Sequence, residues 1–150
     1  MANMRQILVI RNNVNGCSPE LESIASETGK EVAKSGSVLI TGGLGGVMKA
    51  ASHGAKDADG LTVGIIPQDD SAMANKFCDI VIPSGMGLSR DFLNALSADG
   101  VIVVGVVLEH YLRFVQRICT KNLLQLSKTQ VAWQPNILIN LLIIGRMSKL

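Results

Sequence analysis

The architecture of this chain follows from one segment, Val38-Leu39-Ile40-Thr41-Gly42-Gly43-Leu44-Gly45-Gly46-Val47-Met48. A run of aliphatic residues ends abruptly in four glycines within five positions, and a helix-compatible segment follows over residues 47–58. Glycine lets backbone N–H groups approach a ligand closely, and a helix start adds unpaired donors and a partial positive charge. The segment therefore predicts a strand, a phosphate-binding turn and a helix. A turn that serves only helix–strand packing is the alternative.

Apolar runs and amphipathic segments alternate along the chain as far as residue 105. Ser18 and Pro19 are typical of a helix start, and Gly36 of a helix end. Strands are expected at 7–10, 37–40, 61–66, 79–82 and 100–104, and helices at 18–36, 47–58 and 89–97. Strands that are apolar throughout and alternate with helices indicate a parallel sheet covered on both faces. We therefore predict a Rossmann-like α/β domain that binds its ligand at the carboxyl ends of the strands.

Composition narrows the class of protein. The chain has 150 residues, of which 47% are hydrophobic and 17% charged, as expected of a folded domain. A net charge of +2 predicts no nucleic-acid partner, and the absence of a long apolar run predicts no membrane span. Cys17, Cys78 and Cys119 are odd in number and widely spaced, which favours reduced thiols over a disulfide or a metal site. The short apolar run near the N-terminus has no secretory cleavage signal, so we expect a cytoplasmic protein.

Three motifs then occur in order: Thr41-Gly42-Gly43-x-Gly45-Gly46-Val47-Met48-x-Ala50-Ala51, Gly64-Ile65-Ile66-Pro67 and Gly87-Leu88-Ser89-Arg90. Together they resemble the LOG-like proteins of the SLOG superfamily, Rossmann-fold nucleotide binders formerly labelled lysine decarboxylases. The resemblance covers roughly residues 6–105. It is nearest to short prokaryotic members that also resemble molybdenum-cofactor carrier proteins. It implies a nucleoside 5′-monophosphate or a similar phosphorylated ligand, no required cofactor, and a dimer.

Candidate site residues follow from the strand ends and from the resemblance. Arg90 matches the family's catalytic arginine, and a guanidinium can hold a phosphate through two hydrogen bonds. A cation at a helix N-terminus is unfavourable without a balancing anion, which also favours a ligand there over a solvated surface role. The expected nucleotide- or phosphate-binding residues are Thr41, Gly42, Gly43, Gly45, Gly46, Val47, Met48, Asn12, Asn13, Ser84, Gly85, Met86 and Gly105.

The family's second phosphate loop, a GGxGTxxE segment after the fifth strand, is missing from this chain. The sequence continues Gly105-Val106-Val107-Leu108-Glu109-His110-Tyr111 instead. Composition also changes here: residues 1–105 hold fourteen glycines and a net charge of −3, whereas residues 106–150 hold one glycine and a net charge of +5. Residues 1–105 are therefore assigned to a truncated nucleotide-binding domain, and residues 106–150 to an atypical tail.

A displacement of one base would explain both observations. Read one base out of register, the codons of residues 105–119 permit GGVGTLSEICAKNMY, and His110 followed by Tyr111 forces the leucine. We hypothesise that the tail is out of frame from about Gly105. The alternative is a genuine tail, with a basic amphipathic helix over 109–127 and an apolar strand or helix over 137–144.

Three functions remain open at this point. The leading interpretation is binding of a nucleotide monophosphate or phosphorylated cofactor. The first alternative is a nucleoside 5′-monophosphate phosphoribohydrolase, which cleaves the N-glycosidic bond through an oxocarbenium-like state that a carboxylate stabilises. The resemblance places that carboxylate in the missing motif, so hydrolysis is not expected of the chain as written. The second alternative is a non-enzymatic carrier of a pterin-type molybdenum cofactor.

Overall fold

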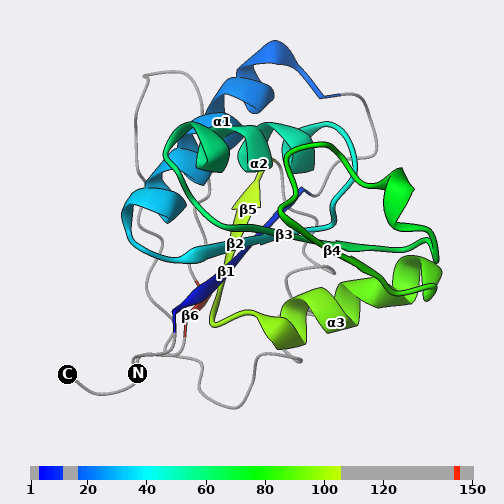
Figure 1. Cartoon of the computed structure of the whole chain (residues 1–150). Coiled ribbons are helices and arrows are strands. Elements are labelled where there is room, and N and C mark those ends of the chain that lie inside the picture. The colour runs from blue at the N-terminus through cyan, green and yellow to red at the C-terminus, as the bar shows by residue number, and fades with distance from the viewer. Residues whose placement is uncertain (1–3, 12–16, 106–143, 146–150) are drawn as a thin grey trace.

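The computed structural model describes residues 4–11, 17–105 and 144–145 (Figure 1). Its centre is a six-stranded sheet in the order β4-β3-β2-β1-β5-β6. Five strands run parallel: β1 (Gln6–Arg11), β2 (Val38–Thr41), β3 (Thr62–Ile66), β4 (Ile80–Pro83) and β5 (Gly100–Val104). Leu8 sits at the centre of the register, opposite Ile40 on one side and Val101 on the other. The predicted Rossmann-like α/β fold is confirmed.

Helices cover the two faces of the sheet unequally. Helices α1 (Pro19–Lys34) and α2 (Val47–Asp57) lie together on one face, and α3 (Arg90–Ser97) crosses the other (Figure 1). Short 3-10 turns η1 (Ser71–Met73) and η2 (Gly87–Ser89) lie in the connections around β4. Since β2, β3 and β4 extend the sheet on one side of β1 and β5 pairs on the other, the direction of chain travel reverses beside β1. Ligands of open α/β sheets bind near such a reversal.

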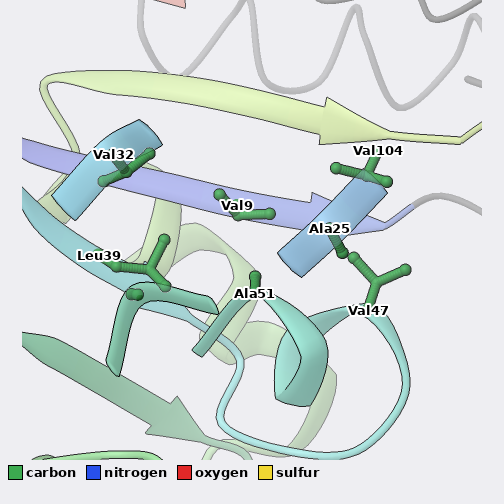
Figure 2. Packing of buried hydrophobic residues seen from close by; sticks show 8 residues of the cluster. Val9, Ala25, Val32, Leu39, Val47, Ala51 and Val104 are labelled. Atoms are coloured by element: carbon green, nitrogen blue, oxygen red, sulfur yellow. The ribbon is translucent and has the colours of Figure 1, made fainter. Parts of the chain in front are cut away.

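Side chains alternate across β1 and divide the core in two. Leu8 and Ile10 face the α3 side, where they pack with Ile40, Ile65, Val101, Val103 and, from α3, Leu93. Val9 faces the other side and packs with Ala25, Val32, Leu39, Val47, Ala51, Ala55 and Val104 (Figure 2). This alternation is the two-residue period of a strand buried on both faces.

The backbones of α1 and α2 come into close contact at glycines. A Cβ placed on Gly29 would collide with the Ala51 carbonyl, and one on Gly54 would collide with the Ser26 carbonyl. Both glycines therefore serve helix packing. The position of α2 relative to the sheet, and of its first turn, depends on this contact.

Two details of the sheet go beyond the sequence prediction. Edge strand β4 is not covered on both faces, because Ile80 and Ile82 are 46% and 42% exposed. The sheet is also not wholly parallel, because β6 (Ile144–Gly145) pairs antiparallel with β5. An apolar run alone does not reveal whether a strand lies at the centre or the edge of a sheet. The expected tail helix at 109–127 lies outside the described residues, as does 137–143.

Candidate functional site

The turn before α2 is built by Thr41 and two glycines in the left-handed region. Gly43 has φ +70° and Gly46, the N-cap of α2, has φ +62°. Thr41 is wholly buried, and its Oγ1 accepts a hydrogen bond of 3.1 Å from the Gly43 N–H. Gly43 also allows close packing, because a Cβ there would collide with Ile66 Cγ2. Thr41 therefore shapes the turn from inside and is not presented to a ligand.

Asn75, which the sequence did not single out, holds the outer side of the same turn. Its Nδ2 donates to the Leu44 carbonyl at 3.0 Å, and its backbone N–H donates to the Gly43 carbonyl at 2.8 Å. Two carbonyl groups of the turn are thereby occupied, so the turn does not direct them at an incoming anion. Asn75 lies in the connection between β3 and β4, 31 residues after Leu44 in the chain, and no local motif distinguishes it.

The first turn of α2 keeps its backbone donors available. The N–H groups of Val47, Met48 and Lys49 have no acceptor among residues 4–11, 17–105 and 144–145. Gly46 offers no side-chain cap, and the first turn of α2 contains no acidic residue. Val47 is 1% exposed and packs in the core beside Ala25, so its side chain belongs to the core and not to the site (Figure 2). An uncapped helix start of this kind is an anion-binding arrangement.

Arg90 lies against this turn from the opposite face of the sheet. A Cβ on Gly42 would lie 2.6 Å from Arg90 Nη2 and 2.6 Å from Met48 Sδ, so a side chain at position 42 would displace the guanidinium and the thioether from the turn. The Arg90 side chain is only 11% exposed and forms an ion pair with Asp91. The structure thus brings together three of the predicted site residues, Gly42, Met48 and Arg90. Asp91, which sequence reasoning missed, is the anion that balances the charge of Arg90 at the start of α3.

Ser84, Gly85 and Met86 form a loop that is joined to the end of β3. Ser84 Oγ donates to the Ile66 carbonyl at 2.7 Å, and the Gly85 N–H donates to the Gln68 carbonyl at 3.0 Å. Ser84 Oγ also accepts from the Met86 N–H at 3.2 Å. The hydroxyl of Ser84 is therefore engaged within the loop, whereas the Met86 side chain is 49% exposed.

Gly105 follows β5 with φ +107°, and a Cβ there would lie 3.9 Å from Leu21 Cδ2 of α1. It therefore lies beside the first turn of α1, at the carboxyl edge of the sheet. Asn12 and Asn13, which were also predicted to bind the ligand, lie outside the described residues.

Within the described residues, the titratable groups near the turn form neither an activated nucleophile nor a metal site. Burial raises the pKa of the Cys78 thiol, which keeps it protonated and unreactive. Within the described ranges, no group of three histidine, cysteine or acidic side chains is placed to hold a metal ion. In the same ranges, no helix is both long and apolar enough to cross a membrane.

The candidate site is thus a glycine turn between a strand and an uncapped helix start, with an arginine placed against it. A family model described as the SLOG cluster4 family matches residues 4–109, and this chain belongs to that family. An uncharacterized protein of Archaeoglobus fulgidus is 44% identical to the chain over 89 residues, which are 59% of this chain and 58% of that protein. The chain therefore spans little more than half the length of this relative.

Two solved structures share the fold closely. The molybdenum cofactor binding protein of Rippkaea orientalis superposes with a TM-score of 0.70 and 36% identity, over 80% of this chain and 73% of that one. The molybdenum cofactor carrier protein of Chlamydomonas reinhardtii superposes with a TM-score of 0.68 and 32% identity, over 80% and 74% of the two chains. The chain therefore belongs to a family whose solved members include cofactor-binding proteins.

Proposed function

We propose that this chain binds a phosphate-bearing small molecule at the first turn of α2, in the manner of a cofactor carrier. The observation that carries the proposal is the contact between Gly42 and the Arg90 guanidinium beside an uncapped helix start. The N–H groups of Val47 and Met48 would hold the phosphate oxygens, and Arg90 would exchange its ion pair with Asp91 for one with the phosphate. Neither group needs a metal to bind an anion.

The cargo that fits best is a phosphorylated pterin of the molybdenum-cofactor type. Two similar proteins are named for binding or carrying that cofactor, and each is covered over more than two thirds of its length. In this chain the turn and Arg90 supply phosphate contacts. The absence of a reactive thiol or acidic cluster near the turn, within the described residues, agrees with carriage rather than turnover. A nucleoside monophosphate presents the same phosphate to the same groups.

Binding is tested by calorimetric titration of the purified chain with inorganic phosphate, AMP and molybdenum cofactor. Arg90→Ala is expected to weaken all three by about tenfold or more, since a hydrogen bond to a charged group contributes about 1.5–3 kcal/mol. Leu96→Ala, an exposed change on the same helix, is the matched control and should leave all three affinities unchanged. Equal binding by wild type and Arg90→Ala would refute the assignment of the site.

Hydrolysis of a nucleoside monophosphate is the second function, and the position of Arg90 against Gly42 is what favours it. The reaction also needs a carboxylate beside the ribose, and the acid nearest Arg90, Asp91, is already paired with it. We therefore expect no release of adenine from AMP by the 150-residue chain. Adenine release above the level of an Arg90→Ala control would establish the hydrolase and overturn the carrier.

We also propose a homodimer formed through α3. Leu88 in η2 and Phe92 and Leu96 in α3 recur every four residues and are 86%, 48% and 68% exposed, which makes an apolar stripe that runs from η2 along α3. The two charges of α3, Arg90 and Asp91, pair with each other, so the stripe is uncharged and suits a second copy of itself. Light scattering should show a dimer for the wild type and a monomer for Leu96→Lys. A monomeric wild type at micromolar concentration would rule it out.

We also propose an origin for the tail, residues 106–150. We propose that residues 106–150 are an out-of-frame product that follows the nucleotide-binding domain and adds only β6 to its sheet within the described residues. The family match ends close to that boundary, at residue 109. Sequencing the coding DNA around codon 105 tests this, because a GGxGTxxE segment must then be present in another frame.

We propose a cytoplasmic location from the free thiols of Cys17 and Cys78. Cell fractionation with a tagged chain tests that assignment.

A further inference from the structure

One polar side chain of α3, that of Asn94, is buried without a hydrogen-bond partner in the described residues. Asn94 is 1% exposed, and neither Nδ2 nor Oδ1 has a hydrogen-bond partner within the described part of the chain. Buried amides are nearly always hydrogen-bonded, because an unsatisfied donor or acceptor loses its water without compensation. An asparagine kept at such a position calls for a role outside the folding of the chain.

The place of Asn94 in the helix connects it to the phosphate site. It follows Arg90 by four residues, so the two side chains leave the same face of α3, one turn and about 6 Å apart. Helix α3 packs against β3 and β1, and Arg90 lies at the end of the helix nearest Gly42. Asn94 is therefore one turn further into the fold than the guanidinium, on the side of the helix that the guanidinium uses.

Packing does not account for the asparagine. The preceding residue, Leu93, packs against the core on this face, and the following residue, Ala95, is itself buried. An apolar side chain of similar size at position 94 would fill the same space without leaving a donor and an acceptor unpaired. A second neutral amide, Gln68 in the loop after β3, also has a buried Oε1 without a partner.

We propose that Asn94 is a specificity-determining residue that binds the neutral part of the ligand next to its phosphate. Its Nδ2 donates and its Oδ1 accepts, so it recognises a group that offers both an acceptor and a donor. A sugar hydroxyl and the amide edge of a pterin or purine ring share this chemistry. This inference rests on the proposed function, since it requires the phosphate to be held by Arg90 and the α2 turn.

The test compares wild type, Asn94→Leu and Asn94→Ala by calorimetric titration with inorganic phosphate, AMP and 2′,3′-dideoxy-AMP. Asn94→Leu should weaken AMP binding by about tenfold, the effect of two neutral hydrogen bonds, and change phosphate binding less than about twofold. Its melting temperature should rise, because two unsatisfied buried groups are removed. Asn94→Ala provides the same comparison if the leucine does not fit. If Asn94→Leu weakens the binding of dideoxy-AMP as much as that of AMP, the contact is with the ring. If it leaves the binding of dideoxy-AMP unchanged, the contact is with the sugar hydroxyls.

The outcomes separate this inference from the function on which it rests. Wild-type protein that binds neither phosphate nor AMP overturns both. Wild-type protein that binds AMP no better than Asn94→Leu overturns the role of Asn94 alone and leaves the phosphate site standing. A lower melting temperature in the leucine variant, with both affinities unchanged, would show that Asn94 serves the fold.

Discussion

Helices α1 and α2 lie side by side on one face of the sheet, yet their first turns are made in opposite ways (Figure 1). The start of α1 is closed by its own sequence: Ser18 Oγ accepts from the Leu21 N–H at 3.2 Å, and Glu20 and Glu22 follow in the first turn. The start of α2 has a glycine N-cap and no acidic residue. Both helices carry the same backbone dipole, so the difference lies in whether the chain supplies the anion itself.

In the proposed function, the start of α1 is structural and the start of α2 binds the ligand. Capping of α1 stabilises the fold in the absence of any partner, because the orphan donors are satisfied internally. The α2 turn does without that contribution and instead has its carbonyls held by Asn75 and Arg90 placed against Gly42. Where a chain leaves one helix start open while it closes the neighbouring one, the open start is the better candidate for a phosphate.

The largest effect is expected from Gly43→Ala. The alanine would adopt φ near +70° and its Cβ would collide with Ile66 Cγ2 and lie 3.2 Å from Gly64 Cα. We expect a loss of about 3 kcal/mol of unfolding free energy and no phosphate binding. Urea denaturation and phosphate titration measure the two effects.

Gly36→Ala is the matched control for that change. Gly36 has a similar φ of +74° but open space around it, so only the backbone strain of about 1 kcal/mol should remain. Equal losses at Gly43 and Gly36 would mean that the close packing of the α2 turn contributes nothing.

Ser18→Ala is expected to have a smaller effect, confined to stability. Removal of the cap of α1 should cost about 1 kcal/mol, the usual contribution of a serine N-cap. Phosphate affinity should stay unchanged, because the proposed function places the phosphate at the start of α2 and not of α1. A parallel loss of phosphate binding in a folded Ser18→Ala protein would contradict the division between the two helix starts.

The sequence identified the closed helix start more completely than the open one. Ser18, Pro19 and Gly36 are local signals, and α1 begins and ends where they predict. The glycines before α2 were also visible, and the structure places Arg90 against Gly42 as the motif suggested. The contacts that complete the site were not visible, since Asn75 reaches Leu44 across 31 residues of chain. Such pairings depend on the tertiary fold and leave no periodic pattern.

Sheet edges were the other point that the sequence could not supply. Strand β4, with Ile80 and Ile82, is as apolar as a central strand, but it lies at the edge of the sheet and both isoleucines are exposed. The antiparallel partner of β5 comes from residues 144–145, which no turn or alternation marks. Whether a strand lies at the centre or at the edge of a sheet depends on the crossover connections between strands, and not on the residues of the strand itself.

A charge at the far end of α2 gives the third prediction. Lys56, in the last turn of α2, pairs with Asp79 at 2.8 Å, and Asp79 also accepts from the Thr62 N–H at 2.9 Å. Desolvation raises the pKa of Asp79, but the hydrogen bonds from Lys56 and Thr62 outweigh it, so the pKa lies below its usual value of 3.8. The stabilisation is therefore complete above pH 3.8 and is lost as the pH falls through the lowered pKa.

Asp79→Asn should thus remove about 0.5–1 kcal/mol at neutral pH, a modest value because the pair is partly exposed. It should also flatten the acid limb of the stability curve below pH 3.8. Thermal melts from pH 2 to 7 measure both changes. An unchanged acid limb would show that Asp79 does not anchor this end of α2. The phosphate affinity of Asp79→Asn should equal that of the wild type, because the first turn of α2 is at the other end of the helix.

The smallest effect on stability, and the sharpest test of the comparison, is expected from Gly45→Asp. Gly45 is exposed and has open space around its Cα, so a side chain fits. A carboxylate there would lie beside the first turn of α2 and give it the kind of internal anion that Glu20 and Glu22 give α1. Stability should rise by about 0.5 kcal/mol, the usual interaction of an anion with a helix N-terminus.

Phosphate affinity should fall in the same variant, because the carboxylate would occupy or repel the anion site, whereas Gly45→Asn should leave affinity nearly unchanged. The two measurements must move in opposite directions if the donors of Val47 and Met48 are kept open for a ligand. A gain in stability with no loss of phosphate binding would mean that the open start of α2 is only an uncapped helix. The glycine turn would then serve packing, which was the alternative that the sequence alone left standing.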